Sequence, residues 1–159
     1  MSRAHVVTVS DGAFHGRRED RSGTALVALL KAAGFEADGP EVVPDEGERI
    51  TEAVMTAVAR GVDLVVATGG TGLGPRDVTP QAIAALVDYE VAGIGEAMRR
   101  EGAKSTPMAV LSRSLAGVRG RTLVISVPGS PKGATESLEA VLPIVGHAIQ
   151  LLHGDTAHS

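Results

Sequence analysis

The segment LVVATGGTGLGPRDVTP, residues 64–80, joins an apolar run rich in valine to a glycine-rich turn that carries an arginine and an aspartate. This order is typical of a buried strand that ends in a tight turn. Glycines adopt positive φ and let backbone N–H groups approach an oxyanion closely. Arg76 supplies a forked cation, and Thr79-Pro80 predicts the start of a helix whose dipole favours negative charge. We therefore predict a phosphate-binding loop.

A glycine-rich turn after a buried strand can also do no more than reverse the chain, and glycine count alone leaves both interpretations open. The P-loop spacing, in which Gly-Lys-Ser/Thr follows four residues after a first glycine, is absent. Gly70 and Gly72 are followed by Gly74, which is not the dinucleotide-binding spacing. Neither an ordinary P-loop nor an ordinary Rossmann site is indicated.

Similar strand-to-loop junctions occur on both sides of this segment. Residues 6–9 and 122–127 are apolar runs that end at small or polar residues, and residues 42–43 and 108–111 are shorter strand candidates, the first of them as an inner strand. Helical spacing of apolar residues predicts helices over 26–33, 50–58 and 138–152. Because strands and helices alternate, we expect an α/β fold: a three-layer α/β/α sandwich with a mostly parallel central sheet. Its ligand crevice is expected beyond the carboxyl ends of the strands.

The size and composition of the chain limit its class. At 159 residues with 43% hydrophobic residues, we expect a single domain over residues 1–153 and a flexible tail over 154–159. A formal charge of -4 and very few aromatic residues argue against nucleic-acid binding. The absence of cysteine excludes disulfides and thiolate ligands. Without a signal-like start or a membrane-length apolar run, we expect a cytoplasmic protein that does not contact membranes.

Two aspartates are candidates for holding Mg²⁺ beside phosphates. Asp77 lies in the glycine-rich turn, and Asp45 follows a predicted strand just before a helix. The alternatives are structural: Asp45 as a helix N-cap, and Asp77 as a favourable charge at a helix N-terminus. For two further segments the sequence also leaves open a binding role and a structural one. The turn at Pro128-Gly129-Ser130 and the basic run 112–121 suit anion binding, or are a plain turn and a solvated loop.

No histidine spacing predicts a metal site, and no Gly-x-Ser-x-Gly elbow predicts a hydrolase. Six motifs occur in order along almost the whole chain. These are Val9-Ser10-Asp11 with 18–23; Val43-Pro44-Asp45; 68–80; 95–99; 111–113 with 116–117 and 119–120; and 128–132. Through these motifs the chain resembles the molybdopterin-binding MoaB/Mog family, which includes the G domain of gephyrin.

The resemblance implies a fold that is commonly trimeric and binds the pterin dithiolene called molybdopterin. It also implies an activity, molybdopterin adenylyltransferase: AMP passes from Mg-ATP to the terminal phosphate of molybdopterin and pyrophosphate is released. The alternative is a non-catalytic molybdopterin-binding or carrier protein of the same family, and a scaffolding trimer is a more distant one. Contacts with molybdenum-insertion or molybdopterin-synthesis proteins are the partners that the resemblance suggests.

The resemblance also assigns residues. Asp45 and Asp77 match the essential aspartates of the family and are expected to be catalytic and to bind Mg²⁺. The phosphates are expected to be bound by Gly69, Gly70, Thr71, Gly72 and Arg76. The pterin end is expected to be lined by Ser112, Arg113, Gly129 and Ser130. The residues expected near the nucleotide are Ser10 and Asp11. The chain departs from the family pattern at Ala92, where proline is usual, and at Gly133, where alanine is frequent; neither change removes a polar group.

Overall fold

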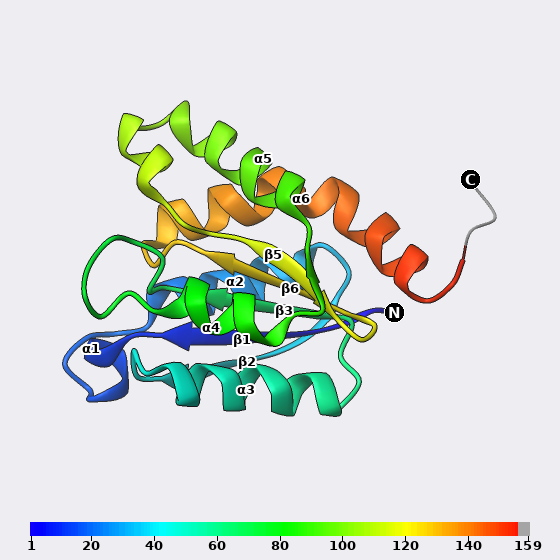
Figure 1. The fold of residues 1–159 in the computed structure, drawn as a ribbon, viewed down its shortest axis with the longest axis horizontal. Helices are drawn as coiled ribbons and strands as arrows, with labels where there is room; N and C mark the ends of the chain where they lie inside the picture. The colour runs from blue at the N-terminus through cyan, green and yellow to red at the C-terminus, as the bar shows by residue number, and fades with distance from the viewer. Residues whose placement is uncertain (156–159) are drawn as a thin grey trace.

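A computed structural model describes residues 1–155 and contains a central six-stranded sheet in the order β2-β1-β3-β6-β5-β4 (Figure 1). Strands β2, β1, β3 and β6 are parallel to one another, and β5 is antiparallel to both β6 and β4. The strands are β1 (Arg3–Val9), β2 (Glu36–Val43), β3 (Leu64–Thr68), β4 (Tyr89–Glu90), β5 (Ala116–Arg119) and β6 (Thr122–Val127). The mostly parallel sheet predicted from the sequence is confirmed.

Helices cover both faces of this sheet and complete three layers. Helices α2, α5 and α6 pack on one face, and α3 and α4 pack on the other. The helices are α1 (Asp11–Phe14), α2 (Arg21–Ala32), α3 (Gly47–Ala59), α4 (Thr79–Leu86), α5 (Ala92–Ala103), the 3₁₀ helix η1 (Pro107–Leu111) and α6 (Pro131–Leu152). The helices predicted over residues 26–33, 50–58 and 138–152 correspond to α2, α3 and the greater part of α6.

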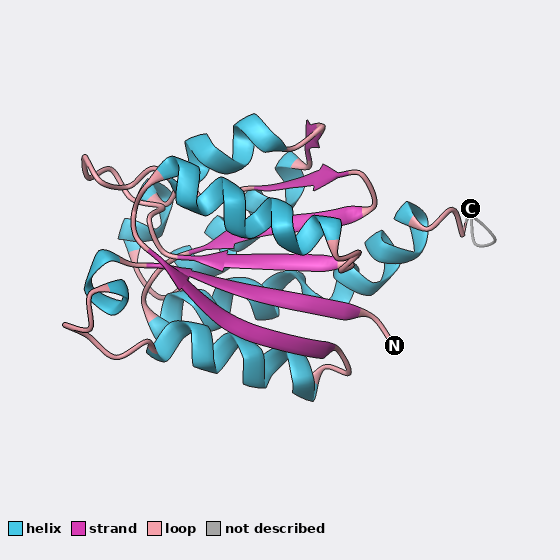
Figure 2. Ribbon diagram, turned by 90° about the horizontal axis from the view of Figure 1, so that it is seen from below, coloured by secondary structure: helices cyan, strands magenta, loops and turns pink. Residues whose placement is uncertain are grey.

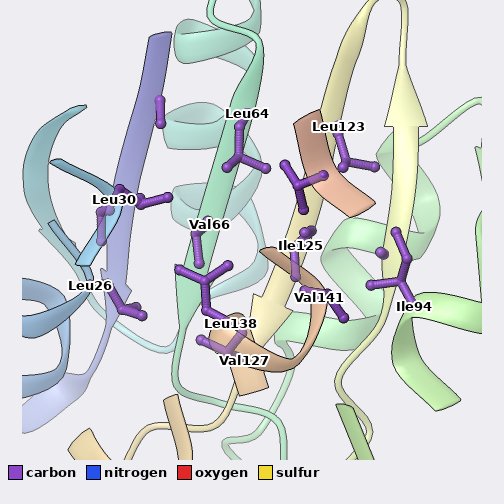
Figure 3. Packing of buried hydrophobic residues seen from close by; sticks show 14 of the residues in the cluster. Leu26, Leu30, Leu64, Val66, Ile94, Leu123, Ile125, Val127, Leu138 and Val141 are labelled. Carbon is purple, nitrogen blue, oxygen red and sulfur yellow. The ribbon is translucent and has the colours of Figure 1, made fainter. Parts of the chain in front are cut away.

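The core explains why the central strands are apolar without alternation. Along β3, Leu64 and Val66 belong to the cluster under α2 and α6, whereas Val65 and Ala67 belong to the cluster under α3 and α4. Figure 3 shows the first cluster, in which Leu26 and Leu138 lie against these strands. A strand that is covered on both faces buries every side chain, so its sequence reads as a continuous apolar run.

Residues 108–111 correct one prediction. They form η1 and not a strand, because Pro107 at the start of the segment cannot donate to a ladder and Thr106 caps the turn by accepting from the Met108 N–H. Met108 and Val110 are 62% and 67% exposed, whereas an apolar strand of this fold would be buried.

The sheet contains more strand than the sequence predicted. Residues 42–43 end β2, which starts at Glu36 and lies at the edge of the sheet, so the inner position expected for them is wrong. An exposed edge strand carries polar residues, and these conceal the strand pattern in the sequence. β5 lies inside the basic run 112–121, where Ala116 and Val118 are buried against the core, so that run is not a solvated loop throughout.

The arrangement places the loops of interest at one edge. The segments after β1, β2, β3 and β6 begin at Ser10, Pro44, Gly69 and Pro128. In Figure 2, the loops that follow these strands gather at the left end of the sheet. This is the edge where parallel α/β sheets bind ligands. Within residues 1–155 no helix is long and apolar enough to cross a membrane, and the predicted tail lies outside the described residues from 156 onward.

Candidate functional site

Two neighbouring cavities open at the carboxyl edge of the sheet. The first, which we call the central cavity, has a volume of about 580 Å³ and is lined by segments that follow β1, β2, β3 and β6. The second, which we call the apolar cavity, has a volume of about 450 Å³ and lies between the glycine-rich loop, α5, η1 and α6. Ser130 lines both cavities, so they are adjacent.

Most of the residues predicted from the sequence meet in these cavities. Those that line the central cavity are Ser10, Asp45, Gly69, Gly70, Asp77, Gly129 and Ser130. Those that line the apolar cavity are Thr71, Gly72, Ser112 and Ser130. Three predicted residues line neither cavity: Asp11, Arg76 and Arg113. The sequence therefore located the edge of the sheet, and the three exceptions have identifiable partners.

Asp11 connects two loops of the site. Its backbone N–H donates to Asp45 Oδ2 at 2.8 Å, and its own Oδ1 accepts from the Asp45 N–H at 3.0 Å. The guanidinium of Arg76 forks onto the same carboxylate, with Nε donating to Oδ2 and Nη2 to Oδ1, both at 3.0 Å. Asp11 thus positions Asp45 from one side and holds the glycine-rich loop through Arg76 from the other.

The electrostatics distinguish these carboxylates. Hydrogen bonds from Arg76 hold the pKa of Asp11 below its usual value, with a further contribution from the Asp45 N–H. Burial raises the pKa of Asp45, and the charges of Asp11 and Asp77 raise it further. Of these two carboxylates, Asp45 is therefore the one whose ionised form an added cation would stabilise more.

The helix-capping alternative for Asp45 is wrong. The N-cap of α3 is Glu46, which makes no capping bond, and the Asp45 carboxylate accepts from the Asp11 N–H. Asp77 precedes Val78, the N-cap of α4, and its Oδ2 accepts from the Gly74 N–H at 2.9 Å. That bond closes the tip of the glycine-rich loop and leaves the other carboxylate oxygen without a hydrogen bond among residues 1–155.

Two glycines of the loop have no room for a side chain. Gly69 has φ of +103°, and a Cβ there would overlap the Val9 carbonyl oxygen. Gly70 has φ of +68°, and a Cβ there would overlap Thr79 Oγ1. Close approach of β1 and α4, in addition to the turn itself, requires glycine at both positions.

We expect Gly69→Ala to destabilise the protein by more than about 2 kcal/mol, because positive φ alone costs about 1–2 kcal/mol and the overlap with backbone adds to it. Gly61→Ala is the matched control: Gly61 has φ of +79°, and an added Cβ would meet nothing within 4 Å. Urea unfolding of both variants measures the difference. Equal destabilisation of the two variants would show that the overlap of the added Cβ with the Val9 carbonyl is relieved at no cost in stability.

Arg113 donates hydrogen bonds to backbone carbonyls of the segment that contains the glycine-rich loop. Its Nη2 donates to the Asp77 carbonyl at 2.7 Å, its Nε donates to the Gly72 carbonyl at 2.9 Å, and its backbone N–H donates to the Thr71 carbonyl at 2.8 Å. The structure therefore places Arg113 against the backbone that shapes the site. Ser10 and Ser130 have a capping contact each, since their hydroxyls accept from the Ala13 and Gly133 N–H groups at the starts of α1 and α6.

Residues 18–23 belong to one motif of the resemblance, but the sequence predicted no role in the site for them. Residues 18–22 form one wall of the central cavity, and Asp20 holds this wall in place. Its carboxylate accepts from Thr8 Oγ1 at 2.7 Å and from the Gly23 N–H at 2.9 Å. The available signal was the N-cap pattern of an aspartate three residues before a glycine at a helix start.

The fold and the cavities define an α/β ligand-binding domain whose site lies at the carboxyl edge of its parallel strands. Residues 5–147 match the family described as "Probable molybdopterin binding domain". The chain belongs to this family, the MoaB/Mog family of molybdenum cofactor biosynthesis.

Curated relatives carry names from the same pathway. The molybdopterin adenylyltransferase of Helicobacter pylori strain J99 is 38% identical over 156 residues, which cover 94% of this chain and 87% of the relative. The molybdenum cofactor biosynthesis protein B of Bacillus cereus is 39% identical and covers 95% of this chain and 90% of the relative.

Solved structures agree with the fold. The MoaB structure from Thermus thermophilus has a TM-score of 0.90 at 50% identity and covers 97% of this chain and 98% of that one. A MogA structure also has a TM-score of 0.90, at 39% identity, with 94% and 99% covered. The three-layer α/β fold is therefore confirmed.

Other relatives are longer. The gephyrin of Dictyostelium discoideum is 40% identical, but the chain spans 22% of its length, and it spans 47% of the bifunctional molybdenum cofactor biosynthesis protein of Synechococcus elongatus. The same domain thus occurs inside larger proteins.

Proposed function

We propose that the protein is a molybdopterin adenylyltransferase. The observation that carries the proposal is that Asp45 and Asp77 both line the central cavity beside the glycine-rich loop, and that the apolar cavity lies next to the central one. The name of the Helicobacter pylori relative supports the same activity. In this reaction an oxygen of the terminal phosphate of molybdopterin attacks the α-phosphorus of ATP. The bond from that phosphorus to the bridging oxygen breaks, and pyrophosphate leaves.

The residues of the central cavity fit a divalent cation. No cationic side chain within residues 1–155 forms an ion pair with Asp45 or Asp77, whereas Asp11 is paired with Arg76. Two carboxylates with uncompensated charge, together with waters and substrate phosphates, are the usual set for Mg²⁺. When bound, the cation neutralises charge on the reacting phosphates.

The chain's own groups orient the two substrates. The Gly69 and Gly74 N–H groups already donate within the protein, so we expect the other backbone N–H groups of the glycine-rich loop to bind the phosphates. The N-terminus of α6 at Ser130 adds a favourable dipole. The apolar cavity, which Met98, Leu111 and Ser112 line, accepts the pterin. Arg113 holds the loop between the two cavities in register. Catalysis by this arrangement consists mainly of in-line positioning and charge neutralisation.

We further propose that residues 1–153 act as one domain and that the protein assembles as a homotrimer. Met108, Val110 and Leu111 support self-association, because three neighbouring apolar side chains on η1 are exposed in the single chain. Light scattering of the purified protein measures its assembly state and tests this part independently of activity.

The experiment that tests the activity mixes purified protein with molybdopterin, MgCl₂ and ATP. Pyrophosphate release is followed, and adenylylated pterin is identified by mass. Product that requires both substrates, and that is absent with Asp45→Asn, supports the enzyme. Tight binding of molybdopterin without pyrophosphate release would replace it with the carrier alternative.

Arg76→Ala should raise the KM for ATP about tenfold and make it less sensitive to salt, because a forked cation near the phosphates is lost. The side chain of Arg76 is 62% exposed and pairs with Asp11 in the free protein, so it is available to exchange partners. Arg121→Ala is the control, since Arg121 donates to the Leu152 and His153 carbonyls at the end of α6. An unchanged KM and salt dependence would leave Arg76 with a structural role only.

A further inference from the structure

One buried hydroxyl next to the central cavity lacks a partner. Within residues 1–155, Thr79 Oγ1 is the one buried side-chain nitrogen or oxygen without a hydrogen bond, and Thr79 is 0% exposed. Buried hydroxyls are nearly always hydrogen-bonded, because desolvation without a partner costs free energy. An exception of this kind at the edge of a ligand site points to a group that binds there.

The capping explanation does not apply to this hydroxyl. Thr79 is the first residue of α4 and not its N-cap, and the N-cap Val78 has no capping side chain. The Thr79 N–H already donates to the Gly70 carbonyl at 3.2 Å. Neither the helix end nor the loop therefore uses the side-chain oxygen.

The position of the oxygen is defined by Gly70. A Cβ added to Gly70 would overlap Thr79 Oγ1 and would lie 3.1 Å from Asp45 Oδ1. Both oxygens therefore approach the same side of Gly70, and Gly70 and Asp45 line the central cavity. The hydroxyl therefore lies on the same side of Gly70 as the Asp45 carboxylate, which no cationic side chain within residues 1–155 neutralises by an ion pair.

Side-chain carboxylates alone do not complete a cation site here. Among the described residues, no group of three or more His, Cys, Asp or Glu side chains is able to hold a metal ion. Asp45 and Asp77 supply two carboxylates, so the other oxygens come from water, substrate or neutral protein groups. A buried hydroxyl beside Asp45 is such a group.

We propose that the Thr79 hydroxyl is a positioning group of a divalent-cation site formed with Asp45 and Asp77, in which it contacts the cation or a water bound to it. The inference rests on the cation-binding role proposed above for the two aspartates. It adds Thr79, which the sequence indicates only as the start of a helix, and it gives the buried hydroxyl its partner when the cation is bound.

The test uses Mn²⁺ alone as the probe, with the full chain and no nucleotide, and counts free Mn²⁺ by its EPR signal. Thr79→Val removes the hydroxyl with little change of shape, and Thr79→Ser retains it. We expect Thr79→Val to bind Mn²⁺ about 10–100-fold more weakly than the wild type, and Thr79→Ser to bind within about threefold of it. In EDTA, Thr79→Val should unfold at the same temperature as the wild type or higher, because an unpaired buried hydroxyl is gone.

Equal Mn²⁺ affinity of the wild type and Thr79→Val overturns the inference, and so does a wild type that binds no Mn²⁺. A second measurement does not depend on the stability of the variants. Anomalous density from Mn²⁺ soaked into wild-type crystals should lie beside Asp45 with Thr79 Oγ1 bonded to the ion or to its water, and density without that contact overturns the inference.

Pyrophosphate release decides the proposed function separately. Cation binding that requires Thr79, in a protein that forms no product, keeps the inference and rejects adenylyl transfer.

Discussion

Asp77→Asn should reduce kcat/KM for adenylyl transfer on the order of 10³-fold while the protein keeps its fold. The amide oxygen of asparagine still accepts from the Gly74 N–H, so the tip of the loop retains its 2.9 Å bond. What is lost is a negative charge at a site that has to hold a cation beside phosphates, and losses of this size follow from removing such charge stabilisation. Steady-state pyrophosphate release and far-UV circular dichroism measure the two parts.

The matched control for this substitution is Asp88→Asn. Asp88 also accepts from a glycine N–H, that of Gly120 at 2.8 Å, but it lies beside β4 and away from both cavities. We expect Asp88→Asn to keep full activity. Near-normal turnover by Asp77→Asn would remove Asp77 from the catalytic role, and parallel losses in both variants would point to stability as the cause.

The fold was predictable from the sequence wherever both faces of a strand are buried. Residues 64–68 and 122–127 are apolar throughout because helices cover both sides of the sheet, and that pattern has few other interpretations. β2 and β5 were not predictable to the same extent, since one is an exposed edge and the other lies within a basic run. Residues 108–111 show the limit: an apolar run on the surface has the composition of a strand.

The candidate site was predictable in its location and less so in its contacts. Asp45 and Asp77 are far apart in the chain, and the parallel topology brings the loops that carry them to one edge. The hydrogen bonds of Asp11 and Arg113 were not visible, because each joins loops whose separation in space depends on the finished fold. The sequence indicated Thr79 only as a helix start, because a threonine there has an ordinary capping interpretation, which its unpaired hydroxyl in the folded protein excludes.

Asp45→Asn should lose activity as severely as Asp77→Asn, yet raise the melting temperature in EDTA at pH 7 by about 2–4 °C. The pKa of Asp45 is raised above its ordinary value of 3.8 by burial and by the charges of Asp11 and Asp77. A carboxyl group with a raised native pKa contributes stability below its unfolded pKa and loses it as pH rises through the native pKa. At pH 7 the ionised group therefore destabilises the cation-free protein, and asparagine relieves this.

The pH dependence of the melting temperature separates this account from a general effect of substitution. The advantage of Asp45→Asn over the wild type should shrink as pH falls through the raised native pKa and vanish below the ordinary value of 3.8, where Asp45 is neutral in both states. Asp11→Asn should behave oppositely, because Arg76 lowers the pKa of Asp11, and that stability is present at pH 7 and lost in acid.

The response to Mg²⁺ is a separate test. Added Mg²⁺ should stabilise the wild type and not Asp45→Asn, since a cation that binds only the native state raises the stability of that state. A variant that is destabilised at pH 7, or that Mg²⁺ still stabilises, would mean that Asp45 holds the loops together and does not bind the cation. The combination of higher stability and lost activity is instead what a site kept for function predicts.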